Sequence, residues 1–263
     1  MANVFPMFSG SEGNATYVGG ATGGVLVDVG VSCKKMKVAL QNANIPLTDI
    51  KAVLITHHHT DHVKGLKVFL KNSNIPLVAS RDTVYALEFL GIIDSNYPRI
   101  YINEEKIATF GDIEITSAKT SHDCLGSSCF SITLGAEQKV SVCTDLGVMT
   151  DEVKNLLMGS TLVVLESNHD PVMLRLGPYP AELKLRISSN EGHLPNAVCA
   201  ETLAELYENG TNRFVLAHLS EQNNTPEKAA SAARAALMDK GAVENEDYIL
   251  YVAPKEGSRV ITI

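Results

Sequence analysis

The feature that most constrains this sequence is a cluster of histidines directly after an apolar stretch. Four of the eight histidines lie within residues 57–62, and Ala52–Ile55 precedes them. In an extended segment, side chains two residues apart point the same way, so His57 and His59 can converge on one cation. Asp61 and His62 then begin a helix and face a second cation nearby. Without cations these polar groups would be crowded and short of partners, so the pattern predicts a metal site.

The other four histidines are spread along the chain but share one kind of surrounding. His122, His169, His193 and His218 each lie at or just after an apolar stretch, where strands end and loops begin. None of them belongs to a solvated helix face. This distribution is expected when the histidines serve a single site.

A binuclear site needs more ligands than the first motif offers. Asp145 ends a predicted strand, and its carboxylate is the best candidate to bridge two ions. Taken alone, Asp145 is equally well explained as a turn-forming residue. His122 would complete the ion held by His57 and His59, and His218 would complete the ion held by the last two residues of the motif.

The order of apolar stretches predicts an α/β fold in one domain covering residues 1–263, because no linker, repeat or low-complexity stretch divides the chain. Strands in both halves, interleaved with helices, fit two packed sheets with helices outside. The predicted strands are Val25–Val29, Ala52–Ile55, Ile113–Thr116, Phe130–Leu134, Val140–Cys143, Leu162–Leu165, Phe214–Ala217, Tyr248–Val252 and Arg259–Ile263. The predicted helices are Ser32–Asn42, Arg81–Leu90, Asp151–Met158, Ala197–Asn209 and Pro226–Lys240, the last with Thr225 as its N-cap.

Cysteine usage and the absence of long apolar runs bear on the cellular location. Met1–Gly10 does not have the basic and apolar regions of a signal peptide, and no apolar run is long enough for a membrane span. Five cysteines without paired CxxC spacing predict a reduced, cytoplasmic protein. We expect most of them to be small buried hydrophobic residues, while Cys124 is close enough to His122 to touch the site.

The formal net charge of −8 argues against broad, nonspecific binding to nucleic acid. Two divalent cations would weaken this objection, because they would add about four positive charges where a phosphate must sit.

The ordered set of His57, His59, Asp61 and His62, followed by His122, Asp145 and His218, resembles the metallo-β-lactamase superfamily. Residues 25–30 also match the early strand of that family, which ends in an aspartate, here Asp28. The resemblance implies an αβ/βα sandwich of two mixed β-sheets flanked by helices, with both metals at one edge. It also implies that Asp28 orients the histidine loop, although a plain turn aspartate explains it as well.

Within the superfamily the chain is similar to the YycJ/WalJ-type exonuclease branch, which is related to ribonuclease Z and the β-CASP nucleases. The segments that carry this likeness are residues 9–14, 120–123, 166–170, 192–196 and 218–224. The chain is too short for the large inserted domain of the β-CASP nucleases. Pro195 stands where a small polar residue is expected, a departure that concerns only the detail of one loop.

The resemblance implies a metal-dependent phosphodiesterase, a 5′-3′ exonuclease with DNA favoured over RNA as its nucleic-acid substrate. A hydroxide bridging the two ions would attack phosphorus in line. Asp61 would take part in catalysis, and His193 would assist the leaving group, because it lies where ribonuclease Z places its assisting histidine. His169 is the rival for that role, and either histidine could instead orient a metal ligand.

Two further groups of residues are candidates for substrate binding. Ser11, Gly13 and Asn14 form a small polar loop whose backbone N–H groups could cradle a phosphate, or simply form a turn. The second group follows the Asn168–His169 segment and could hold the nucleic-acid backbone, or be solvated charges: Arg175, Lys184 and Arg186.

Three alternatives to a nuclease stay open. One is another hydrolase of the superfamily, acting on a thioester, a lactone, a β-lactam or a small or cyclic phosphodiester. Another is a flavodiiron-type oxidoreductase, although that branch prefers a carboxylate where His59 stands. The third is a binding protein without catalysis, although such relatives usually lose ligands. Imidazole and carboxylate donors suit Zn²⁺, Mn²⁺ and iron alike, and the oligomeric state is open as well.

Overall fold

The computed structural model describes residues 1–71, 73–102, 107–135 and 138–263. Within these residues the strands form two sheets of seven strands each. The first sheet has the order β14-β1-β2-β3-β4-β5-β6, and the second has the order β13-β12-β11-β10-β9-β8-β7. Each sheet combines antiparallel pairs on one side with parallel pairs on the other, so both are mixed.

The strands of the first sheet are β1 (Asn3–Phe8), β2 (Ala15–Gly20), β3 (Gly23–Val27), β4 (Ile50–Leu54), β5 (Leu77–Ala79), β6 (Arg99–Tyr101) and β14 (Ile261–Thr262). Those of the second are β7 (Ala108–Phe110), β8 (Ile113–Lys119), β9 (Ser128–Leu134), β10 (Gln138–Cys143), β11 (Leu162–Glu166), β12 (Arg213–Ala217) and β13 (Ile249–Val252).

The α-helices are α1 (Cys33–Asn42), α2 (Thr60–Val63), α3 (Leu66–Leu70), α4 (Arg81–Phe89), α5 (Asp151–Leu157), α6 (Pro171–Leu176), α7 (Ala181–Ile187), α8 (Asn196–Glu208) and α9 (Pro226–Asp239), with a 3₁₀ turn at Leu47–Asp49. None of the helices in the described part of the chain has the length and apolar character needed to cross a bilayer.

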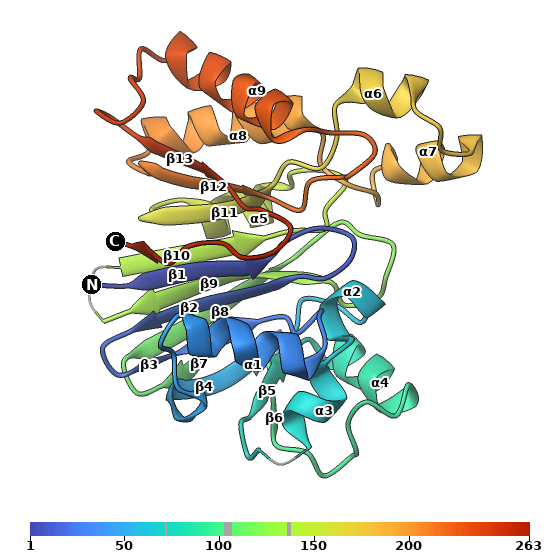
Figure 1. The fold of residues 1–263 in the computed structure, drawn as a ribbon, viewed down its shortest axis with the longest axis vertical. Coiled ribbons are helices and arrows are strands. Elements are labelled where there is room, and N and C mark those ends of the chain that lie inside the picture. The colour runs from blue at the N-terminus through green and yellow to red at the C-terminus, as the bar shows by residue number, and fades with distance from the viewer. Residues whose placement is uncertain (72, 103–106, 136–137) are drawn as a thin grey trace.

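Alternating side chains of the strands build a four-layer sandwich. In β3, Val25 and Val27 enter the core between the two sheets, while Leu26 faces the opposite way into a core shared with α1, α3 and α4. In β11, Val164 faces the central core and Leu165 faces α5, α8 and α9. Because both faces of each sheet are covered, the parallel strands are mostly apolar. Figure 1 shows the helices above and below the sheets, and the predicted αβ/βα sandwich of two mixed sheets is confirmed.

The predicted helices agree with the structure to within one residue at each end. Helix α9 begins at Pro226, and the hydroxyl of Thr225 accepts a hydrogen bond from Lys228 N at 3.2 Å, as expected for an N-cap. The strand predicted at Arg259–Ile263 is shorter than expected, because only Ile261 and Thr262 pair with β1. The sequence indicated the start of α2 at the histidine motif, but it did not indicate the strands β1, β2, β5, β6 and β7 or the short helices α3, α6 and α7.

The turn after β3 shows how closely the backbone packs around the histidine motif. Gly30 N donates to Asn14 O at 2.8 Å, and Asn14 N donates to Asp61 O at 2.8 Å. A Cβ atom on Gly30 would lie 1.7 Å from Asp61 O, which no real contact permits. Only glycine therefore lets α2, which carries Asp61, approach this turn.

We expect Gly30→Ala to destabilise the protein by about 1–3 kcal/mol, because the added methyl group must push the Asp61 backbone away. Urea unfolding followed by circular dichroism measures this difference. Gly20→Ala is the matched control, because a Cβ atom there would meet nothing closer than 4.0 Å, and it should cost less than about 0.5 kcal/mol. Equal stability of the two variants would contradict this account of the turn.

Candidate metal centre

The candidate site lies at one edge of the sandwich, where strands of both sheets end. The described site residues follow or end different strands: Asp28 after β3, Thr56–His62 after β4, His122 after β8, Asp145 after β10, Glu166 at the end of β11 and His218 after β12. In Figure 1 this edge lies on the right, beside α2, while both chain ends lie on the left. Loops at the carboxyl ends of strands are where α/β folds commonly place ligands.

The turn between β4 and α2 brings the histidine motif together as predicted. The ring centroids of His57 and His59 are 4.6 Å apart, and those of His57 and His62 are 4.1 Å apart. His57 and His62 are almost fully buried, while 29% of the His59 side chain is exposed. Asp61 Oδ2 lies 3.5 Å from His62 Nε2. His58 belongs to none of the groups of described residues whose ligand atoms lie within 4.8 Å of one another.

Asp28 holds the histidine motif in place through hydrogen bonds. Its carboxylate accepts hydrogen bonds from Thr56 N at 2.9 Å and from Thr56 Oγ1 at 2.9 Å. Asp28 Oδ2 also lies 2.8 Å from His62 Nδ1, so this nitrogen carries the proton and donates. His62 Nε2 is then free to face Asp145 Oδ2, 3.2 Å away. Burial raises the pKa of Asp28 even though its contact with His62 acts in the opposite direction.

His122 is oriented in the same manner by a backbone carbonyl. Its Nδ1 lies 3.1 Å from Gly192 O, which can only accept, and its Nε2 lies 3.3 Å from His59 Nδ1. Gly192 itself has no room for a side chain, because a Cβ atom would lie 2.2 Å from Ile187 O. Asp123, which the sequence analysis did not single out, places Oδ1 3.5 Å from His122 Nε2.

Asp145 occupies the middle of the cluster. Its Oδ2 faces His62, while its Oδ1 lies 3.6 Å from His218 Nδ1 and 3.9 Å from His122 Nε2. Contacts with residues from both sides of the cluster are what the predicted bridging position requires. Three site residues adopt left-handed backbone conformations where their strands end: Asp28 with φ 65°, Asp145 with φ 60° and His218 with φ 54°. Such conformations are uncommon outside glycine and often occur at functional sites.

Glu166 is the main site residue that sequence reasoning missed. It is fully buried, and its Oε1 lies 2.8 Å from His193 Nδ1 and 2.7 Å from His218 Nδ1. Its Oε2 accepts hydrogen bonds from the backbone N–H groups of Leu146 and Leu194, both at 3.1 Å. Burial alone would raise the pKa of this carboxyl, but His193 and the other hydrogen bonds lower it overall. Its signals in the sequence were its place at the end of an apolar strand and in the segment 166–170, which carries the likeness to the exonuclease branch.

The structure distinguishes His193 from His169. His193 donates to Glu166 through Nδ1, lies 3.5 Å from Asp145 Oδ1 and leaves 18% of its side chain exposed. Burial lowers its pKa, but Glu166 and Asp145 outweigh this effect and raise it. His169 is buried, its Nδ1 has no hydrogen bond, and burial lowers its pKa to about 4. His193 thus reaches both the cluster and solvent, whereas His169 is only 2% exposed.

Part of the backbone of the loop predicted to cradle a phosphate forms hydrogen bonds within the protein. Gly13 N donates to Gly10 O at 3.0 Å, and Asn14 N donates to Asp61 O, so these two N–H groups are engaged within the protein. The Asn14 side chain instead contacts His62 Nε2 at 3.1 Å and Asp61 Oδ2 at 3.3 Å. The predicted phosphate cradle is therefore wrong for the N–H groups of Gly13 and Asn14, because both already donate to carbonyl oxygens of the protein. The side chain of Asn14 supports the histidine motif instead. Ser11 is exposed, and its role stays a prediction.

The three basic residues predicted to bind substrate are placed differently from one another. Arg186 forms an ion pair with Asp123, which lies next to His122 and His59. Lys184 Nζ donates to the carbonyl of Arg175 at 2.9 Å, which joins α7 to α6. The hydrogen bonds and ion pairs of the described residues thus link Arg186, but not the other two, to the cluster.

Two observations test whether this cluster suits metal ions. Three buried atoms of its side chains have no hydrogen bond, although such atoms are costly to leave unpaired: His57 Nε2, Asp145 Oδ2 and His218 Nε2. Groups of three residues also place their ligand atoms within 4.8 Å of one another, including Asp61, His62 and His218. Imidazole and carboxylate donors at this spacing fit a transition metal, so the residues present suit the predicted ions.

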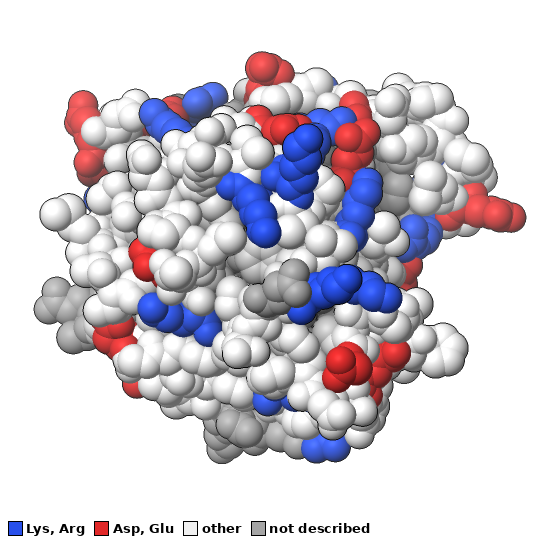
Figure 2. Space-filling view, turned by 60° about the horizontal axis from the view of Figure 1, so that its bottom comes forward, with Lys and Arg blue, Asp and Glu red and all other residues white. Residues whose placement is uncertain are grey.

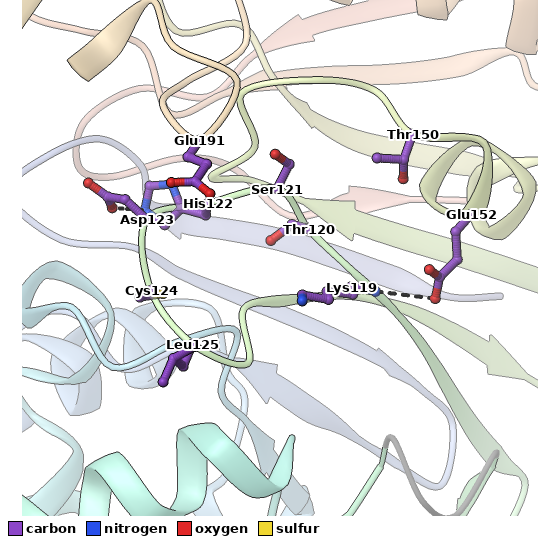
Figure 3. Close-up of a pocket in the computed structure, with 10 residues that line it drawn as sticks. All are labelled: Lys119, Thr120, Ser121, His122, Asp123, Cys124, Leu125, Thr150, Glu152 and Glu191. Atoms are coloured by element: carbon purple, nitrogen blue, oxygen red, sulfur yellow. Dashed lines mark hydrogen bonds and ion pairs between the residues drawn. The ribbon is translucent and has the colours of Figure 1, made fainter. Parts of the chain in front are cut away.

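A cavity of about 590 Å³ opens next to the cluster at His122 and Asp123. Figure 3 shows that the loop after β8 carries both residues, with Glu191 close to them and Thr150 and Glu152 farther along the cavity. The cavity gives a reacting molecule space beside the proposed centre.

Comparison with known proteins supports this description. The chain is 37% identical over 234 residues to "Exodeoxyribonuclease YycJ" of Bacillus anthracis, covering 89% of this chain and 88% of that protein. It is 36% identical to "Exodeoxyribonuclease WalJ" of Streptococcus pneumoniae serotype 2, strain D39, covering 84% of this chain and 82% of that protein.

Solved structures agree on the fold. The metallo-β-lactamase fold protein YhfI from Bacillus subtilis superposes with a TM-score of 0.72 at 16% identity, covering 99% of this chain and 98% of that one. The model of the beta-lactamase superfamily domain matches residues 24–219, which include every predicted metal ligand. The chain therefore belongs to the metallo-β-lactamase superfamily.

Proposed function

We propose that this protein is a binuclear metal-dependent phosphodiesterase that degrades DNA from the 5′ end. The buried, unpaired ligand atoms of His57, Asp145 and His218 carry the metal part of this proposal. The choice of DNA rests on the two relatives named exodeoxyribonuclease, which match more than four fifths of the chain.

Two groups of side chains would hold the ions, with Asp145 between them. The first comprises His57, His59 and His122, and the second comprises Asp61, His62 and His218. Zn²⁺ and Mn²⁺ are the ions we favour, and iron also suits these donors. Bound ions would lower the pKa of a water molecule that attacks phosphorus, and would neutralise charge on the phosphate.

His193 is placed to serve the leaving oxygen. Its Nδ1–H is held by Glu166, so Nε2 is directed away from Glu166 and is available for proton transfer. Glu166 also accepts a hydrogen bond from His218 Nδ1. One carboxylate therefore orients both His193 and the proposed metal ligand His218. The Nδ1 atom of His169 has no such partner among the described residues, and we assign this histidine no chemical step.

The surface is less uniform than the net charge of −8 suggests. On the face drawn in Figure 2, several Lys and Arg side chains lie near the middle, while Asp and Glu lie mainly farther out. Arg186 additionally brings a half-exposed guanidinium next to the cluster through Asp123. Together with two ions, this guanidinium would attract a phosphate backbone. All five cysteines are free, and a cytoplasmic location stays a prediction.

The assignment is tested by digesting duplex DNA that is phosphorylated at the 5′ end and labelled at the 3′ end, after reconstitution with Zn²⁺ or Mn²⁺. We expect mononucleotides to be released from the 5′ end while the 3′ label is retained until late. RNA and a panel of thioesters, lactones and bis-p-nitrophenyl phosphate are run in parallel. Cleavage of the esters with intact nucleic acid under every metal would refute the nuclease assignment.

We expect His59→Ala to lower both metal content and nuclease activity, because it removes a donor from the first ion. His58→Ala is the matched control, since His58 is its neighbour in sequence yet lies outside the ligand groups. Elemental analysis after gel filtration measures the metal bound per chain, and it should change only for His59→Ala. Equal loss of metal in both variants would contradict the assignment of His59, and not His58, as a metal ligand.

We expect His193→Ala to lower kcat by about 10²–10⁴-fold, because the leaving oxygen loses its proton donor. The metal content should remain at the wild-type level, which separates this role from that of a ligand. Steady-state kinetics beside elemental analysis makes the distinction, and His169→Ala serves as the comparison. Full turnover by the His193→Ala protein would remove this histidine from the mechanism.

A further inference from the structure

The loop after β8 carries a thiol close to the histidine motif. The sulfur of Cys124 and one ligand nitrogen each of His57 and His59 lie within 4.8 Å of one another. Cys124 is half-buried, and Figure 3 shows it on this loop between Asp123 and Leu125. His57 is 1% exposed, and its Nε2 has no hydrogen bond within the described structure. A buried imidazole with an unpartnered nitrogen thus lies beside a thiol.

Backbone hydrogen bonds hold this loop in position. Thr120 N donates to Ser127 O at 3.0 Å, and Ser128 N donates to Thr56 O at 3.0 Å. Thr56 directly precedes His57, so the two ends of the Cys124 loop are tied to the start of the histidine motif. Gly126 O accepts a further hydrogen bond from Ser80 Oγ at 2.7 Å, at the N-terminus of α4. The separation between the sulfur and the imidazoles is therefore set by the fold.

We propose that Cys124 is a thiolate ligand of the ion held by His57 and His59. The proposal rests on the proposed function, because it assumes an ion at that position. On binding, the S–H bond would break, the sulfur would form a bond to the cation and the proton would pass to solvent. The thiolate would join the imidazoles of His57 and His59, whose ligand nitrogens it approaches, beside the other donors that the proposed function assigns to this ion. Imidazole nitrogen and thiolate sulfur are donors that zinc favours in proteins.

A thiolate at this position has a consequence for the choice of metal. Sulfur is a soft donor and favours Zn²⁺, whereas oxygen donors suit Mn²⁺. The ion held by His57 and His59 would therefore prefer zinc. The second group has only imidazole and carboxylate donors, so it would be the less selective of the two. The two positions in one centre would then differ in the metal they retain.

Cobalt substitution tests the proposal directly, because a thiolate bound to Co²⁺ gives a charge-transfer absorption in the near ultraviolet. We expect this band in the wild-type protein and in Cys33→Ala, in which a buried cysteine at the start of α1 is removed. We expect its loss in Cys124→Ala and Cys124→Ser, although these proteins should still bind cobalt. The visible bands of Co²⁺ and elemental analysis report that binding independently of the thiol.

The outcomes separate this proposal from the proposed function. A charge-transfer band that persists in Cys124→Ala, or a cobalt-loaded wild-type protein without the band, would overturn the thiolate ligand but leave the metal centre in place. A wild-type protein that binds no cobalt, zinc or manganese would overturn both.

A second measurement needs no variant. Zn²⁺ should protect Cys124 of the wild-type protein from alkylation by iodoacetamide, as read by peptide mass spectrometry. Unchanged alkylation of Cys124 in fully zinc-loaded protein would also overturn the proposal.

Discussion

The centre depends on hydrogen bonds that fix the outer nitrogen of its imidazoles. An imidazole can present a lone pair to a cation only if its proton is held on the other nitrogen. In four of the proposed ligand rings the outer nitrogen is Nδ1, and it has its own partner: Thr56 for His57, Asp28 for His62, Gly192 O for His122, and Glu166 for His218. The inner nitrogens are thereby prepared before any ion arrives.

The two orienting carboxylates belong to different sheets. Asp28 follows β3 of the first sheet, and Glu166 ends β11 of the second. The relative position of His62 and His218, which these carboxylates orient, is therefore set by how the sheets pack, through a central core that includes Val27 and Val164. Because such cores are close-packed, a change in one sheet is transmitted to the relative position of the ligands. The geometry of the site therefore depends on how the two sheets of the sandwich pack.

Sequence reasoning succeeded where a local pattern determines the structure. The helices with capping residues, such as α9 after Thr225, were located to within a residue, and the histidine motif converges as expected. Strand β1 was missed because Pro6 interrupts its pattern and its pairing with β2 is irregular at that point. Helices such as α3, with five residues, are too short to show a helical period.

The part of the site that could not be predicted depends on contacts between distant segments. Nothing local indicates that Glu166 would be fully buried, because its partners His193 and His218 come from two later loops. The same holds for Asn14, whose side chain reaches the histidine motif only after the sheet has formed. The single-domain organisation stays a prediction from the sequence.

The left-handed backbone at Asp28, Asp145 and His218 affects how mutational data on this family member should be read. Replacing one of these residues by alanine changes two things at once, because alanine in that conformation costs about 1 kcal/mol or more on its own. Asparagine tolerates the conformation and removes only the charge of an aspartate. Carboxamide substitutions therefore report on the chemistry of the two carboxylates, whereas an alanine scan would mix it with conformational strain.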